Sequence, residues 1–297
     1  MNTIPAKTII TYKSDHAWFG TDYNMNIYKG CCHGCIYCDS RSDCYQITDF
    51  DTVCCKENAL EIIHNELRKK TKTGVIGTGA MSDPYNPYEK KYQLTRQALQ
   101  LIDTYHFGIA IATKSNLITR DIDLLQKIKK HSPVLCKITV TAANDDICRL
   151  IEPGVCISSE RMEAVRMLSQ AGLFTGILLT PLLPHLTDTP DNILSIINAA
   201  HNSGASFIYP MFGVTLRSGQ REYLYQKFDE HFSGKNLKQI YMKTYGSTYE
   251  CHSPREKELK DIFIKECNRL GILYKMKDII HAYKGSYHYE QLSLFKI

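Results

Sequence analysis

Short apolar runs alternate with amphipathic segments along most of the chain. The runs have the length of buried strands, and the segments between them carry apolar residues at the three- and four-residue spacing of helices. A β-like stretch at residues 21–30 opens the series. Predicted strands follow at residues 74–79, 107–113, 134–141, 173–180 and 206–212. Predicted helices lie at residues 56–69, 89–105, 120–130, 159–171, 189–202 and 220–231.

This alternation predicts an α/β protein built from βαβ units around a parallel sheet. The pattern holds about six units, fewer than the eight of a closed barrel, so we expect a partial (β/α)6 TIM-type barrel. The sequence divides into an N-terminal segment at residues 1–20, the barrel at residues 21–231 and a C-terminal α/β extension at residues 232–297. The extension contains a predicted helix at residues 254–270, and it either packs on the barrel or forms a cap that faces the substrate.

Composition predicts an ordinary globular protein outside the membrane. Hydrophobic residues make up 43% of the 297 residues and charged residues 23%, and no apolar run approaches the roughly 18 residues of a membrane span. The N-terminal stretch lacks the apolar core of a secretory signal, so we expect a cytoplasmic protein with no membrane partner. The net charge of +5 permits a nucleic-acid partner without requiring one.

Twelve cysteines are many for a chain expected in a reducing compartment, where structural disulfides are rare. Cys31, Cys35 and Cys38 have C-x3-C-x2-C spacing directly after the first predicted strand. A loop with this spacing can hold three thiolates against one face of a [4Fe–4S] cluster and leave the fourth iron without a protein ligand. Tyr37, beside the last of these cysteines, can pack on an adenine ring.

The open iron can bind the amino and carboxylate groups of S-adenosylmethionine. Electron transfer from the reduced cluster then breaks a carbon–sulfur bond and releases a 5′-deoxyadenosyl radical, while the protein supplies binding and orientation. Two alternatives stay open at this point. A zinc site would need a fourth ligand such as Cys32 or His33, and a redox pair would use Cys35 with Cys38.

With these residues the chain resembles the radical S-adenosylmethionine superfamily and, within it, the spore photoproduct lyase-like group, also called DNA repair photolyase-like. The cysteine motif carries the first likeness. Later stretches carry the second: TGAMSDPYNPYEK, IATKSNLITRDIDLL, LIEPGVCISSERMEAVRMLSQAG and LLTPLLPHLTD. The resemblance implies a radical enzyme that receives electrons from a donor such as flavodoxin or ferredoxin.

The resemblance also implies a pocket for S-adenosylmethionine. Ser82 matches a serine that contacts the cofactor, and Lys114 matches a lysine near its carboxylate. Thr139 stands where the family has a serine contact, with Thr141 as the neighbouring alternative. Thr180 lies where the family backbone meets the adenine. These positions also follow predicted strand ends, where ligands gather in such barrels.

Arg161, at the start of a matched helix, carries over without a definite role. Two positions depart from the lyase pattern. The lyase has a hydrogen-donating cysteine two residues before the matched serine, and here that residue is Ala80. It has a tyrosine after the last cluster cysteine, and here that residue is Asp39. Neither can serve the lyase's radical relay, so we expect an unidentified substrate and assign no catalytic side chain.

Nucleic acid is the substrate class that the group's name implies. A tyrosine-rich end with lysines between the tyrosines resembles a surface that stacks the bases of a single strand, and a packing segment is the alternative. Its tyrosines are Tyr274, Tyr283, Tyr287 and Tyr289. A different class of function, a zinc-stabilised interaction protein without enzyme activity, would use the cysteine loop structurally.

Overall fold

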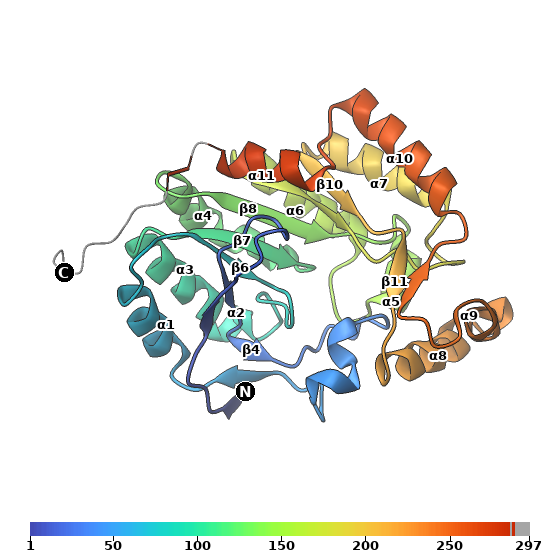
Figure 1. Ribbon diagram of the computed structural model, residues 1–297, viewed down its shortest axis with the longest axis horizontal. Helices are drawn as coiled ribbons and strands as arrows, with labels where there is room; N and C mark the ends of the chain where they lie inside the picture. The colour runs from blue at the N-terminus through green and yellow to red at the C-terminus, as the bar shows by residue number, and fades with distance from the viewer. Residues whose placement is uncertain (286, 289–297) are drawn as a thin grey trace.

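The computed structural model describes residues 1–285, 287 and 288, so Tyr289 lies outside the described residues (Figure 1). Six parallel strands form the main sheet, and the antiparallel β2 (Ile10–Tyr12) joins it at one edge. Across the sheet the parallel strands are β10 (Phe207–Pro210), β9 (Phe174–Leu179), β8 (Val134–Thr139), β7 (Gly108–Thr113), β6 (Val75–Thr78) and β3 (Tyr23–Met25). Successive strands are neighbours joined by helical crossovers, which confirms the partial (β/α)6 barrel.

Successive side chains along each strand point to opposite faces of the sheet, and helices cover one of these faces. In β7, Ile109 and Ile111 pack into the large core under the helices, whereas Ala110 belongs to a separate cluster on the other face. The helices of the large core are α1 (Ala59–Arg68), α3 (Leu94–Thr104), α4 (Ile122–Lys129), α6 (Ser158–Gln170), α7 (Pro190–Asn202) and α10 (Glu256–Leu270).

Three predicted elements are divided in the structure. The predicted helix at residues 89–105 breaks at Gln93, whose φ of 51° is left-handed, into α2 (Glu89–Tyr92) and α3. The first β-like stretch divides into β3 and β4 (Tyr28–Lys29), and the latter pairs with β5 (Cys54–Lys56) beside β1 (Asn2–Ile4). The predicted helix at residues 120–130 begins in the 3-10 turn η3 (Asn116–Asp121) and continues as α4.

The pattern missed α5 (Asp145–Ile151). Its start is fixed by Asn144, whose side-chain oxygen accepts hydrogen bonds from the backbone amides of Asp146 and Ile147. Further 3-10 turns are η1 (Asp39–Arg41), η2 (Asp43–Tyr45) and η4 (Ser233–Lys235). The predicted helix at residues 220–231 is α8 (Gln220–His231).

The C-terminal extension contributes to both faces of the barrel. It contains α9 (Leu237–Tyr245), β12 (Glu250–His252), α10 and α11 (Met276–Lys284). Strand β12 pairs with β11 (Gly213–Thr215), and α10 lies beside α7 on the helical face (Figure 1). No helix in the described part of the chain has the length and apolar character needed to cross a membrane.

On the opposite face lies an apolar cluster that we call the barrel floor: Phe19, Val75, Ala110, Leu135, Leu178, Phe207 and Ile279. Most of its strand residues come from the first halves of their strands. Helix α11 covers it, and the Tyr283 hydroxyl of that helix donates a hydrogen bond to the Phe19 carbonyl. Tyr283 also stacks on Phe174, so this tyrosine packs within the fold and is not a free stacking surface.

Candidate functional site

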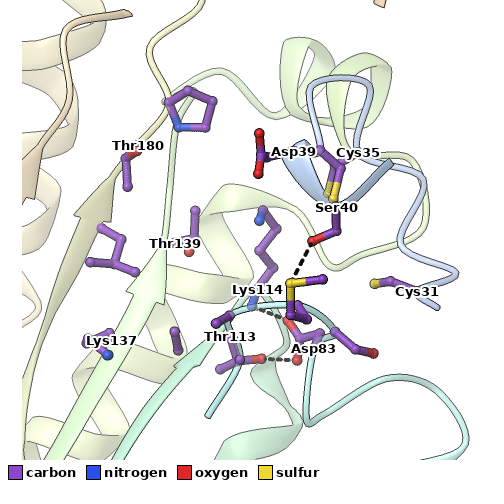
Figure 2. A pocket seen from close by; sticks show the side chains of 18 of the residues that line it. Cys31, Cys35, Asp39, Ser40, Asp83, Thr113, Lys114, Lys137, Thr139 and Thr180 are labelled. Carbon is purple, nitrogen blue, oxygen red and sulfur yellow. Dashed lines mark hydrogen bonds between the residues drawn. The ribbon is translucent and has the colours of Figure 1, made fainter. Parts of the chain in front are cut away.

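A cavity of about 500 Å³ lies at the carboxyl ends of the parallel strands (Figure 2). The loops that follow parallel strands converge at this end, which is why ligands gather there in barrels. Most of the residues singled out from the sequence line it: Cys31, Cys35, Tyr37, Cys38, Ser82, Lys114, Thr139 and Thr180. Arg161 does not line the cavity, and neither does Thr141; both are buried behind it.

The cysteine loop, residues 31–38, is held by backbone hydrogen bonds to the region around α5. The Ile36 amide donates to the Ile151 carbonyl at 2.9 Å, and the Gly154 amide donates to the His33 carbonyl at 2.9 Å. A Cβ at Gly154 would lie 2.8 Å from that same carbonyl oxygen, so the loop can approach this closely only because the residue is glycine. The loop therefore has a fixed path before any ligand binds.

The thiols of this loop suit an iron–sulfur cluster. All twelve cysteines are free, and those that line the cavity are Cys31, Cys35 and Cys38. Burial raises the pKa of Cys31 to about 12, and burial also raises the pKa of Cys35 although Lys114 opposes the shift. Thiols this desolvated ionise only beside positive charge, which the irons of a cluster supply.

No group of three His, Cys, Asp or Glu side chains in the described residues is arranged to hold a single metal ion. A cubane cluster differs from such a site because it binds its cysteine ligands through separate iron atoms.

Asp83 joins the loop after β6 to the end of β7. Its carboxylate accepts hydrogen bonds from the Thr113 hydroxyl at 2.6 Å and from the Lys114 amide at 2.8 Å. It also lies 3.5 Å from the ring Nδ1 of His33 in the cysteine loop. These contacts fix the base of Lys114, whose side chain extends into the cavity (Figure 2). Its Nζ lies 5.6 Å from the centre of the Tyr37 ring.

The turn that carries Ser82 begins at Gly79, which has a φ of +94°. A Cβ at Gly79 would lie 1.9 Å from the carbonyl oxygen of Ala112 in β7. The Ser82 hydroxyl donates to the Gly30 carbonyl at 2.5 Å, which joins this turn to the residue before the cysteine loop. Glycine at position 79 therefore brings three parts of the cavity wall together.

Gly79→Ala is expected to lower the free energy of unfolding by more than about 3 kcal/mol, because it combines left-handed strain with a backbone collision. Gly271→Ala is the matched control, since Gly271 is left-handed, with a φ of +68°, and has nothing within 4 Å of a Cβ there. The control should cost only about 1–2 kcal/mol. Urea unfolding of both variants measures the difference, and equal midpoints would contradict this account of the turn.

A buried ion pair stands behind the cavity wall. Arg161 is fully buried and its Nη1 lies 2.6 Å from the carboxylate of Glu152, which is 1% exposed. Burial favours the neutral acid, but Arg161 and Lys114 hold the pKa of Glu152 below its usual value. The Tyr37 hydroxyl donates to that carboxylate, and Arg161 donates to the Thr139 carbonyl at 3.0 Å. Arg161 is therefore a positioning residue for two cavity residues.

Aromatic rings and a guanidinium gather at the rim of the cavity. The Arg217 guanidinium lies 4.8 Å from the Tyr249 ring centre and 5.8 Å from the Tyr45 ring centre. The Tyr45 hydroxyl donates to Asp39 at 2.8 Å, and Arg217 lies 3.8 Å from the same carboxylate. Asp39 is thus tied into the rim, and both Asp39 and Ala80 line the cavity.

Sequence reasoning did not assign roles to several residues that build this site. Asp83 and Glu152 were part of matched stretches, but their role depends on contacts between separate loops. Gln220, at the start of α8, is buried and donates to the Tyr37 carbonyl at 2.9 Å. Lys137 lines the cavity from the middle of β8. A lone lysine within the apolar run 134–141 is a signal that could have found it.

Comparisons with known proteins identify the class to which this fold and site belong. Residues 25–200, more than half of the chain, match the family model of the Radical SAM superfamily. The chain therefore belongs to the Radical SAM superfamily, a superfamily of enzymes.

The chain is similar to an uncharacterised protein of Mycobacterium tuberculosis, with 28% identity over 206 residues, 67% of this chain and 60% of that protein. It is also similar to an uncharacterised protein of Methanocaldococcus jannaschii, with 33% identity over 172 residues, 57% of this chain and 63% of that protein. The chain thus spans less than two thirds of the length of these relatives.

A solved structure of spore photoproduct lyase complexed with dinucleoside spore photoproduct has the same fold. Its TM-score is 0.64 at 15% identity, over 91% of this chain and 80% of that one. The likeness in fold therefore extends well beyond the barrel itself.

Proposed function

We propose that this protein cleaves S-adenosylmethionine reductively at a [4Fe–4S] cluster held by Cys31, Cys35 and Cys38, and that the radical acts on an unidentified substrate. One observation carries the proposal: the three cysteines share a single cavity with five residues assigned to the cofactor. Family membership supports the same chemistry. When bound, the cluster and S-adenosylmethionine together supply a 5′-deoxyadenosyl radical by one-electron cleavage of a carbon–sulfur bond.

The residues of the cavity would hold the cofactor by charge, hydrogen bonding and packing. Burial disfavours charge on Lys114, but Cys35 and Glu152 keep the pKa of its ammonium above its usual value, so it is a cation at neutral pH that can pair with a carboxylate. Ser82 and Thr139 offer hydroxyls. The Tyr37 ring offers an apolar face, and the backbone at Thr180 offers polar groups after the end of β9.

The proposal is tested with protein reconstituted anaerobically with iron and sulfide. Dithionite-reduced protein incubated with S-adenosylmethionine is expected to produce 5′-deoxyadenosine, measured by chromatography. Protein that holds a full complement of iron and acid-labile sulfide but makes no 5′-deoxyadenosine would overturn the proposed reaction. In the cell the electron would come from a donor such as flavodoxin or ferredoxin, and the twelve free cysteines favour a cytoplasmic location.

A nucleic-acid substrate is favoured by the rim of the cavity. Arg217 is 38% exposed and lies against two tyrosine rings, an arrangement that can stack a base and pair with a phosphate. The lyase whose structure resembles this one was solved with a dinucleoside photoproduct. The departure at Ala80 separates the present chain from that lyase's radical relay, so a different nucleic-acid reaction is the form of this alternative.

Binding of single-stranded DNA should weaken steeply with salt, because phosphate contacts release counterions. Arg217→Gln is expected to weaken oligonucleotide binding by about tenfold. Arg269→Gln, which removes a surface ion pair with Glu266 on α10, is the control and should leave binding unchanged. Fluorescence anisotropy across a salt series measures both variants. Absence of binding by the wild-type protein near physiological salt would exclude this substrate class.

A further inference from the structure

Lys137 occupies the middle of the barrel and not its surface. It lies on β8 with Ala112 of β7 and Gly176 of β9 as its neighbours across the sheet. Ala112 leaves room on one side of the Lys137 side chain, whereas the Phe207 ring of the barrel floor fills the space beside Gly176 on the other. Lys137 lines the same cavity as the cysteine loop (Figure 2). Its residue exposure is 2%. A long cationic side chain is thus enclosed where most barrels place apolar or ligand-binding residues.

Its depth separates Lys137 from the residues assigned to the cofactor. Thr139 ends β8, so Lys137 stands two residues, about 6.6 Å of extended strand, deeper in the barrel. Its Nζ lies 4.5 Å from the ring centre of Phe19 in the barrel floor. The ammonium therefore lies between the apolar floor and the end of the cavity that holds Lys114 and the cysteines.

Lys137 has no anionic partner among the described residues, since no hydrogen bond or ion pair joins its ammonium to another side chain or to a carbonyl. Burial, together with the nearby charge of Lys13, lowers the pKa of Lys137 to about 7. Two buried arginines among the described residues do have partners: Arg161 lies against Glu152, and Arg221 donates to the carbonyls of Leu216, Gly246 and Thr248. A buried cation without a partner is costly, and such a residue persists where a ligand completes it.

We propose that Lys137 binds an anionic oxygen of the substrate, from a carboxylate or a phosphate group, in the deep half of the cavity. Trp18, Thr21 and Asn24 also line this cavity, and they offer an aromatic ring and polar groups to the remainder of the substrate. The inference rests on the proposed function, because it places a substrate beneath the cofactor. It adds the chemical class of the group that this substrate carries.

Trp18 supplies the measurement. It is the single tryptophan of the chain and lines the cavity that contains Lys137, so its fluorescence reports on ligands there. Cluster-loaded protein is titrated under anaerobic conditions with thymidine 5′-monophosphate against thymidine, and with benzoate against benzyl alcohol. At least one anion is expected to bind about tenfold or more tightly than its neutral counterpart, as a charge-assisted hydrogen bond implies. The pair that shows the difference distinguishes phosphate from carboxylate.

Lys137→Met should abolish this preference for the anion, whereas Lys137→Arg should retain it. The methionine variant is expected to fold, because it replaces an unpaired ammonium with an apolar chain of similar length, and its thermal midpoint should rise. Equal anion affinities in the wild-type and methionine proteins would overturn the proposal. So would a methionine variant whose only binding defect is toward S-adenosylmethionine, since Lys137 would then belong to the cofactor pocket.

Failure of this inference is distinguishable from failure of the proposed function. Wild-type protein is assayed in parallel for 5′-deoxyadenosine without any added probe. Production of 5′-deoxyadenosine with no preference for either anion would overturn the role of Lys137 and leave the radical chemistry standing. A preference for an anion without production of 5′-deoxyadenosine would support the role of Lys137 and overturn the radical chemistry.

Discussion

Replacing Cys35 with alanine is expected to remove the cluster and lower 5′-deoxyadenosine formation by more than about 100-fold. This loss exceeds the one that follows when a residue that only hydrogen-bonds to a metal ligand is replaced. Replacing Cys32 with alanine is expected to leave both unchanged. Cys32 is in the same loop, but it packs against the large core and does not line the cavity. The pair of variants therefore separates ligation from any general disturbance of the loop.

Iron, zinc and acid-labile sulfide are measured in both variants after identical anaerobic reconstitution. Equal iron and sulfide in the two proteins would contradict the assignment of Cys35 as a ligand. One zinc per chain without sulfide in the wild-type protein would instead favour the structural zinc site, and with it a role in binding partners. The result thus discriminates between an enzyme and an interaction protein.

Replacing Arg161 with methionine is expected to lower the free energy of unfolding by about 3–5 kcal/mol, because it leaves the buried Glu152 carboxylate without its partner. The double variant Arg161→Met with Glu152→Gln should recover most of this loss, since a neutral amide can still accept the Tyr37 hydrogen bond. Urea unfolding of the wild type, both single variants and the double variant completes the cycle.

Losses that simply add in the double variant would show that the two side chains are not coupled. Weaker binding of S-adenosylmethionine by the Arg161 variant is a second expected result, because Arg161 holds the Thr139 carbonyl and acts on Tyr37 through Glu152. Calorimetric titration of cluster-loaded protein measures this effect. An unchanged affinity would limit Arg161 to a role in stability.

Periodicity predicted the barrel because each strand is buried on both faces and each crossover helix has one apolar side. It did not predict the break at Gln93, since a single left-handed residue leaves the helical spacing on either side intact. In the extension, the predicted helix at residues 254–270 is α10, but α11 was not predicted; it occupies part of the stretch for which a tyrosine-rich surface and a packing segment were the alternatives. Its position depends on contacts with the opposite end of the chain.

The residues of the candidate site also fall into those that could be predicted from the sequence and those that could not. The spacing of the cysteines was read from a short motif, and the family resemblance supplied most of the proposed cofactor residues; the structure places all of these except Arg161 along one cavity. The roles of Asp83, Glu152 and Gln220 come from hydrogen bonds between loops far apart in sequence, which spacing does not encode. Arg161 was placed among the cofactor residues by its motif, whereas the structure buries it one layer behind the cavity.

The barrel floor joins segments from opposite ends of the chain, and this affects the order of events during synthesis. Phe19 contacts the barrel early in the sequence, but the helix that holds it in place begins at Met276. About 240 residues follow Cys38 before that helix, which is on the order of 10–50 s of translation. The cysteine loop therefore leaves the ribosome long before α11 can cover the barrel floor beneath Lys137.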